Sequence, residues 1–215
     1  MIIETLVVGQ IQTNCYVIAD AKTRQGAVVD PGGNADMILK TVDKHNLDIG
    51  YVINTHAHFD HMLANADLVR MLSSRQKTAP KLAAHLDAVS LLEQGGGARW
   101  FGLWAARSPR PDLELQDGAE LAIGTLLMRV LHTPGHSPGC ICLYCATEKM
   151  LFGGDVLFRD GVGRTDLPGG DWDILMHSIV NKLFVLPDEV VVYPGHGMPT
   201  TIGREKKSNP FVRLG

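Results

Sequence analysis

The stretch Thr55-His56-Ala57-His58-Phe59-Asp60-His61 places four groups that can bind a metal within six residues, directly after a short apolar run. In an extended loop, His56 and His58 project to the same side of the chain, as two ligands of one metal ion must. Asp60 and His61 begin the helical pattern that follows. We therefore expect them to face a second metal position beside the one that His56 and His58 share. Two sets of ligands with two orientations are typical of a site for two metal ions about 3.5–4 Å apart.

Three further groups of the same kind occur in one recurring context. His136, Asp155 and His196 each follow a strand-like run, in loops that are rich in Gly and Pro. Such loops converge if the strands that precede them end at the same edge of the fold. Five of the nine histidines then belong to one predicted site, together with Asp60 and Asp155.

The hydrophobic pattern alternates between strand-like and helical segments in two similar halves. We expect Asp117-Gly118 and Ile123-Gly124 to be hairpin turns within residues 113–131. Helical spacing over residues 172–183 places Trp172 on the buried face. Strand-like runs cover residues 4–8, 15–19, 26–30, 51–54, 81–84, 140–144, 150–152 and 190–193, and helical spacing covers 35–45, 60–72, 87–94 and 172–183.

The composition is that of an ordinary globular protein, with 215 residues of which 45% are hydrophobic and 20% charged. We expect one domain over residues 1–215. The 20 Lys and Arg against 23 Asp and Glu give a net charge of -3, which argues against a nucleic acid partner and a nuclease. With no basic leader and no apolar run of about 20 residues, we expect a cytoplasmic protein with no membrane partner. The oligomeric state is left open.

The four cysteines suggest neither a redox centre nor a zinc ribbon. Cys142 and Cys145 have C-x-x-C spacing, but residues three apart on a strand point to opposite faces. No second C-x-x-C pair is present in the sequence. We therefore expect buried thiols that pack as small apolar groups.

In combination, H-x-H-x-D-H at 56–61, the T-P-G-H-S segment at 133–137, Gly153-Gly154-Asp155 and Gly195-His196 resemble the metallo-β-lactamase superfamily over essentially the whole chain. The resemblance implies an α+β fold, the αββα sandwich, in which two mixed sheets pack face to face with helices outside. It implies a site for two divalent ions, zinc first, with iron or manganese as alternatives. The implied ligands are His56, His58 and His136 for one ion, Asp60, His61 and His196 for the other, and Asp155 as a bridge.

Residues 162–171, 193–197 and 200–211 are similar to the hydroxyacylglutathione hydrolase (glyoxalase II) group, in its short form without a C-terminal helical domain. This similarity implies hydrolysis of a small-molecule thioester such as S-lactoylglutathione by a metal-bridging hydroxide, which Asp60 would orient. An iron-dependent persulfide dioxygenase of the same superfamily is the alternative, because it shares the Gly-Arg-Thr-Asp segment at 163–166. The surroundings of His196 and the tail favour the hydrolase. We expect no β-lactamase, because no export signal is visible.

Cationic side chains near the predicted site could bind the carboxylates of glutathione. The candidates are Arg164, Arg204, Lys206 and Lys207. The last three could equally form a solvated charge run. For Arg164, we favour a salt bridge with Asp166 behind the metal loops over direct contact with the substrate.

The remaining sequence signals leave alternatives open. Residues 95–104 could act as a lid over the substrate or as a packing surface for the body or a second subunit. His85 could border the cleft, and we expect His132 to be a hydrogen-bonded histidine at a strand end. We expect His45 and His177 on helix surfaces or at caps.

Overall fold

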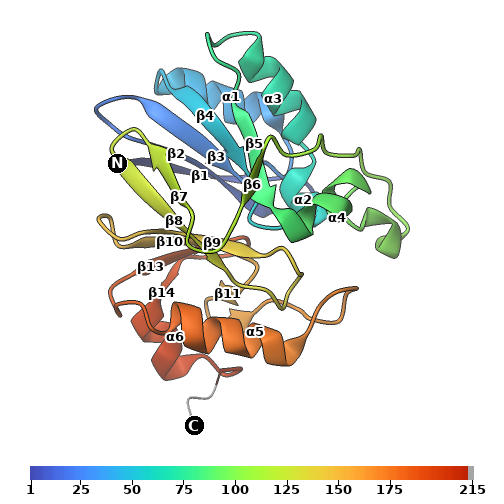
Figure 1. Ribbon diagram of the computed structural model, residues 1–215, viewed down its shortest axis with the longest axis vertical. Helices are drawn as coiled ribbons and strands as arrows, with labels where there is room; N and C mark the ends of the chain where they lie inside the picture. The colour runs from blue at the N-terminus through green and yellow to red at the C-terminus, as the bar shows by residue number, and fades with distance from the viewer. Residues whose placement is uncertain (213–215) are drawn as a thin grey trace.

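Two six-stranded sheets pack face to face in the computed structural model, which describes residues 1–212 (Figure 1). The first sheet contains, in spatial order, β1 (Ile2–Val8), β2 (Thr13–Ala19), β3 (Gln25–Val29), β4 (Asp48–Ile53), β5 (Lys81–His85) and β6 (Leu113–Leu115). The second contains β14 (Thr200–Thr201), β13 (Val191–Pro194), β10 (Met150–Gly154), β9 (Ile141–Cys145), β8 (Leu126–His132) and β7 (Glu120–Ile123). A short ribbon of β11 (Leu157–Phe158) and β12 (Gly161–Val162) lies beside the second sheet.

Both sheets are mixed. In the first sheet β1, β2 and β3 run antiparallel, and β3 to β6 run parallel. In the second sheet β10 and β13 form a parallel pair among antiparallel neighbours. The expected pair of mixed sheets is confirmed.

Helices cover the outer face of each sheet (Figure 1). Residues of α1 (Ala35–Lys44) and α3 (Asn65–Ser73) form one apolar cluster with the first sheet, and residues of α5 (Trp172–Ser178) and α6 (Ile202–Ser208) form another with the second. The short helices α2 (Phe59–Met62) and α4 (Val89–Glu93) lie at one end of the first sheet. The expected αββα sandwich is therefore confirmed. No helix within residues 1–212 is long and apolar enough to cross a membrane.

Strand β2 shows why the sequence forms a layered core. Tyr16 and Ile18 face the second sheet, while Cys15 and Val17 face the helices on the other side. All of these side chains are buried, so the strand is apolar on both faces rather than alternating with polar residues.

The chain crosses from one sheet to the other between β6 and β7. Strand β6 pairs with β5 in the first sheet, and β7 pairs with β8 in the second. The turn predicted at Asp117-Gly118 is present, but the expected hairpin there is wrong, because the strands on its two sides belong to different sheets. An Asp-Gly pair indicates that the chain reverses direction. It does not indicate that the strands before and after it pair with each other. The hairpin at Ile123-Gly124 is confirmed between β7 and β8, and Gly124 adopts a positive φ.

Two helical predictions differ from the structure. The helix expected over 60–72 is divided into α2 and α3, because the N–H of Ala64 donates to Pro31 O and leaves the helical pattern. The helix expected over 172–183 changes at Ile179 into a π-helical turn, while Leu175, Ile179 and Leu183 all lie on the buried face. Trp172 is 43% exposed, so its predicted burial is wrong.

The cysteines are all free and buried, as expected. Cys142 lies in the apolar cluster under the outer helices of the second sheet, whereas Cys145 lies in the cluster between the two sheets. Strand geometry separates the two thiols and excludes a shared site.

Candidate metal centre

Seven His and Asp side chains converge at one edge of the sandwich, where strands of both sheets end. The first sheet supplies four of them from the loop and short helix after β4, and the second supplies three from the loops after β8, β10 and β13. The structure thus brings together every ligand predicted from the sequence. They are His56, His58, Asp60 and His61 from the first half of the chain, and His136, Asp155 and His196 from the second.

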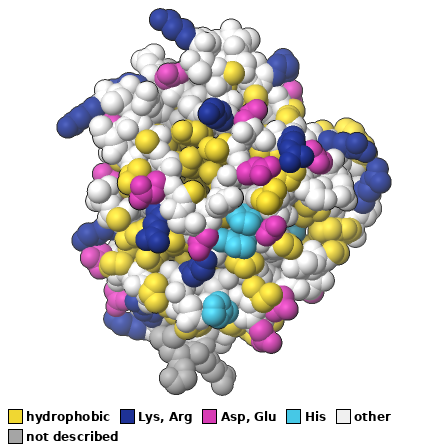
Figure 2. Space-filling model, viewed as in Figure 1, with side chains coloured by type: hydrophobic (Ala, Val, Ile, Leu, Met, Phe, Trp, Pro, Cys, Tyr) yellow, Lys and Arg dark blue, Asp and Glu magenta, His cyan; other side chains and the backbone are white. Residues whose placement is uncertain are grey.

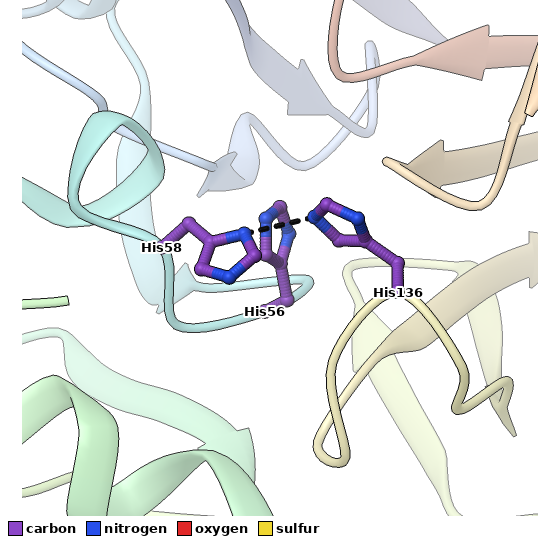
Figure 3. Close-up of side chains that lie close together, drawn as sticks. All are labelled: His56, His58 and His136. Carbon is purple, nitrogen blue, oxygen red and sulfur yellow. Dashed lines mark hydrogen bonds between the residues drawn. The ribbon is translucent and has the colours of Figure 1, made fainter. Parts of the chain in front are cut away.

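One group consists of three imidazole rings, which Figure 3 shows facing one another. His56 and His58 lie on the loop after β4, and their ring centroids are 4.8 Å apart. His136 reaches them from the loop after β8, and its Nε2 lies 2.8 Å from Nδ1 of His58. Three nitrogens from two sheets therefore surround one position.

A second group lies beside the first. Oδ2 of Asp60 is 3.1 Å from Nε2 of His196 and 3.4 Å from Nε2 of His61. Asp155 lies between the two groups, with Oδ1 3.5 Å from Nε2 of His61 and Oδ2 3.8 Å from Nε2 of His136. This arrangement offers two neighbouring positions for cations, with one carboxylate between them.

The donor atoms of this cluster fit a metal. Four buried atoms of the cluster have no partner at all: Nε2 of His56, Nε2 of His58, Nε2 of His61 and Oδ1 of Asp155. Buried polar atoms in proteins are nearly always satisfied, so a group of such atoms in one cluster indicates a cation site. Imidazole and carboxylate ligands suit zinc, iron and manganese. Burial also lowers the pKa of His58 to about 3, which keeps its ring neutral, as a metal ligand must be.

Asp30 is a residue of this site that the sequence analysis missed. Its buried carboxylate accepts hydrogen bonds from the N–H and hydroxyl of Thr55 (2.7 and 2.6 Å), and Oδ2 lies 3.0 Å from Nδ1 of His61. Burial opposes a charge on His61, but the surrounding carboxylates outweigh it and raise the pKa of this ring. A positive charge is therefore favoured at the position that a metal would occupy. The available signal was an acidic residue between a buried strand and Pro31.

Two more contacts orient the ligands. Nδ1 of His136 donates to the carbonyl of Arg164 at 2.7 Å, because a carbonyl can only accept, and this leaves Nε2 free for a metal. The hydroxyl of Thr13 donates to Oδ2 of Asp60 at 2.9 Å. His136 and Asp60 are thus each held by a partner outside the cluster.

Gly195 leaves the space that the cluster needs. A Cβ atom at this position would lie 2.1 Å from Oδ1 of Asp155 and 2.7 Å from Cε1 of His61. Only a residue without a side chain can precede His196 in this loop.

A cavity of about 290 Å³ lies over the cluster. Besides cluster residues, its lining consists of apolar side chains and one cation: Ile11, Phe59, Phe101, Leu103, Leu167 and Arg164. Phe101 and Leu103 belong to the segment 95–104, whose role as lid or packing surface stays a prediction. The space-filling view shows hydrophobic side chains on its right-hand side, over the segment between α4 and β6 (Figure 2). In this segment Trp104 is 83% exposed.

The cationic residues predicted to contact substrate are already paired or lie elsewhere. Arg164 lines the cavity and forms a two-bond salt bridge with Asp166 (2.6 and 2.7 Å), so the pair borders the cavity rather than lying behind the loops.

The three C-terminal cations do not line this cavity. Arg204 contacts Asp160 and Glu205, and Lys206 contacts Asp188 at 2.7 Å. Lys207 is exposed at the end of α6. Their position supports the alternative of a charged helix surface.

His85 and His132 form a separate pair outside the cavity lining. Their rings stack with centroids 3.9 Å apart and an angle of 9°. Nε2 of His132 lies 2.8 Å from the carbonyl of Pro138, which confirms the expected strand-end hydrogen bond. Elsewhere, His45 follows α1 and contacts Glu4, and His177 is exposed on α5.

Comparison with known proteins agrees with the fold. Residues 8–196 match the family model described as the metallo-beta-lactamase superfamily. The chain is 38% identical to hydroxyacylglutathione hydrolase GloC of Haemophilus influenzae, over 99% of this chain and 98% of the relative.

Three solved structures extend the comparison. BLEG-1 B3 metallo-beta-lactamase matches with a TM-score of 0.89 and 38% identity, covering 98% of this chain and 99% of that one. TTHA1623 in a di-iron-bound form matches with a TM-score of 0.86 and 36% identity, covering 97% and 100%. ETHE1 from Myxococcus xanthus matches with a TM-score of 0.78 and 31% identity, covering 98% and 84%. With its αββα sandwich and its His/Asp metal-binding cluster, the chain belongs to the metallo-β-lactamase superfamily.

Proposed function

We propose that the protein is a dinuclear metallohydrolase that cleaves thioesters, including hydroxyacyl thioesters of the S-lactoylglutathione type. The observation that carries the proposal is the cluster of buried, unpartnered imidazole and carboxylate atoms at the floor of a cavity. The similarity to a hydroxyacylglutathione hydrolase over nearly the full length of both chains supports the thioester as substrate.

Two divalent cations would lower the pKa of bound water, and their positive charge would polarise a carbonyl group. We assign His56, His58 and His136 to one ion, Asp60, His61 and His196 to the other, and Asp155 to both. TTHA1623 in its di-iron form supports two ions and makes iron an alternative to zinc.

The protein's own residues would orient the water molecule that reacts. Asp60 accepts a hydrogen bond from Thr13, lies beside His196 and lines the cavity. Burial favours the neutral acid, but the imidazoles of His61 and His196 outweigh it and hold the pKa of Asp60 below its ordinary range. The ionised carboxylate would accept a hydrogen bond from the attacking oxygen.

In the reaction, the water oxygen forms a bond to the carbonyl carbon, and the C–S bond breaks. The sulfur leaves with the bonding electron pair as a thiolate, and the products are a carboxylate, a thiol and one proton. A thiolate is a good leaving group, so no strong general acid is required. This fits a cavity whose lining carboxylates, Asp60 and Asp155, both belong to the ligand cluster.

The proposal is tested with protein purified without chelators. Elemental analysis should find two divalent ions per chain, and the metal-replete protein should release thiol from S-lactoylglutathione. His58→Ala should lower both metal content and thiol release, whereas His177→Ala, on the exposed face of α5, should change neither.

Assays with two other substrates could contradict the thioester proposal. Oxygen uptake with sulfite release from glutathione persulfide, without thioester cleavage, would favour the dioxygenase alternative. Hydrolysis of a chromogenic β-lactam in place of thioesters would instead favour an activity like that named for BLEG-1. Either result would overturn the thioester proposal.

A further inference from the structure

The cavity over the ligand cluster has an apolar wall without a free cation. Ile11, Phe101 and Leu103 line it, and each is about half exposed although each side chain is large and apolar. Exposed apolar groups that surround a polar floor mark a surface that a ligand covers. The wall is made by two segments far apart in the sequence, the loop between β1 and β2 and the segment after α4.

Arg164 is the one Lys or Arg side chain among the residues that line this cavity within 1–212. Its Nε and Nη2 both donate to the carboxylate of Asp166, and its Cζ lies 5.9 Å from the ring centroid of Phe101. Asp166 thereby neutralises the positive charge that a substrate carboxylate would meet at this side chain. Arg204 and Lys206 are paired with acidic residues outside the cavity.

We infer that this cavity selects thioesters that carry an apolar substituent and does not recognise the carboxylates of glutathione. The inference rests on the proposed thioester hydrolase and narrows its substrate class. Ile11, Phe101 and Leu103 bind the apolar substituent beside the ligand cluster, where the bound ions would polarise the reacting carbonyl. The substituent can belong to the acyl group or to the thiol, and the two sources are separated by experiment.

The first experiment varies one half of the substrate at a time. Acetyl, butanoyl and hexanoyl thioesters of N-acetylcysteamine vary the acyl group, and acetyl thioesters of ethanethiol and butanethiol vary the thiol. One of the two series varies the group that fills the cavity. In that series, kcat/KM should rise about fourfold per methylene, which corresponds to about 0.8 kcal/mol of apolar burial. A flat response in both arms would overturn the inference.

The second experiment tests the carboxylates directly. S-hexanoylglutathione and its dimethyl ester have nearly the same shape but differ by two negative charges. We expect kcat/KM for the diester to equal or exceed that for the diacid. A diacid preference of tenfold or more would overturn the inference and still support a thioester hydrolase. Failure of the metal-replete protein to cleave any thioester in either experiment would instead overturn the proposed function.

Substitutions in the apolar wall test whether its side chains cause the selectivity. Leu103→Ala and Ile11→Ala should each reduce the gain in kcat/KM per methylene. Leu127→Ala is the matched control, because Leu127 is similarly exposed at 46% but lies on β8 outside the cavity lining. Leu103→Lys adds a free cation and should raise the diacid to diester ratio at least threefold. An unchanged methylene gain in both alanine variants would exclude this wall as the selecting surface.

Discussion

The buried carboxylate of Asp30 lies 3.0 Å from Nδ1 of His61, on the side of the ring that faces away from the ligand cluster. A carboxylate at Nδ1 favours the tautomer with a proton on that nitrogen, so the lone pair of Nε2 faces Asp60 and Asp155. The pair thus links the end of β3 to His61, whose Nε2 lies near both Asp60 and Asp155.

Replacing Asp30 by Asn should weaken metal binding. The amide would turn an N–H toward Nδ1 of His61 and favour the tautomer whose Nε2 carries the proton. We expect metal affinity to fall about 10- to 100-fold, as for other partners of metal-binding histidines. Competition with a chromophoric chelator measures the effect. Asp20→Asn is the control, because Asp20 is also a buried carboxylate but bonds Thr125 away from the cluster. Equal affinities for wild type and Asp30→Asn would contradict this role.

Gly195→Ala should disrupt the metal centre by steric conflict. The added Cβ would meet Oδ1 of Asp155 at 2.1 Å, so the carboxylate or the loop must move. We expect a loss of metal content and a destabilisation of about 1–3 kcal/mol, as for other overpacked sites. Gly50→Ala is a matched control, since its nearest contact is Gly26 O at 4.0 Å. Elemental analysis and urea unfolding of both variants measure the effects, and normal metal content in Gly195→Ala would contradict the expectation.

Asp166→Ala should change substrate preference more than stability. The Arg164–Asp166 pair is exposed, so its loss should alter the free energy of unfolding by less than about 1 kcal/mol. The freed guanidinium could then bind a substrate carboxylate, and the kcat/KM ratio of S-hexanoylglutathione to its dimethyl ester should rise several-fold. An unchanged ratio would show that Asp166 does not block this cation.

The buried thiols should make the folded protein less stable at alkaline pH. Burial raises the pKa of Cys142 to about 12, whereas a thiol in the unfolded chain titrates near 8.5. Above pH 8.5 the unfolded state loses a proton that the folded state keeps, so the free energy of unfolding falls as pH rises. At pH 10 this loss is about 2 kcal/mol for one such thiol.

The comparison of wild type with Cys142→Ala isolates this effect. Urea unfolding at pH 7.5 and pH 10 should show a smaller decrease in stability for the variant. The alanine also leaves a cavity that lowers stability. This loss is the same at both pH values, so it cancels in the difference between the free energies of unfolding at pH 7.5 and pH 10. Parallel decreases for the two proteins would rule out titration of this thiol.

Much of the site could be predicted because its chemistry is local in the sequence. Each of the seven ligands follows a strand-like run, and strand ends that share an edge bring such groups together. The sandwich itself follows from strands such as β2 that are apolar on both faces. These signals depend on residue type and period, which can be read without knowing the tertiary structure.

The missed features depend on contacts between distant segments. Asp30 is 31 positions from His61 in the chain, and a carboxylate before Pro31 has the appearance of an ordinary turn residue. Phe101 and Leu103 lie in a segment without a regular hydrophobic period, so only packing places them over the cavity. The partners of Arg204 could not be predicted either, because a charge pattern does not say which acidic group will be near.

The single crossing between β6 and β7 divides the chain into two halves, each of which forms one sheet. The proposed metal ligands are divided in the same way, with His56 to His61 before the crossing and His136 to His196 after it. Bound ions would therefore act as a non-covalent cross-link between the two halves of the polypeptide. Separating the sheets, whether by denaturant or by mechanical force, would require the coordination to break first, so metal loading would slow unfolding of the whole protein as well as supporting catalysis.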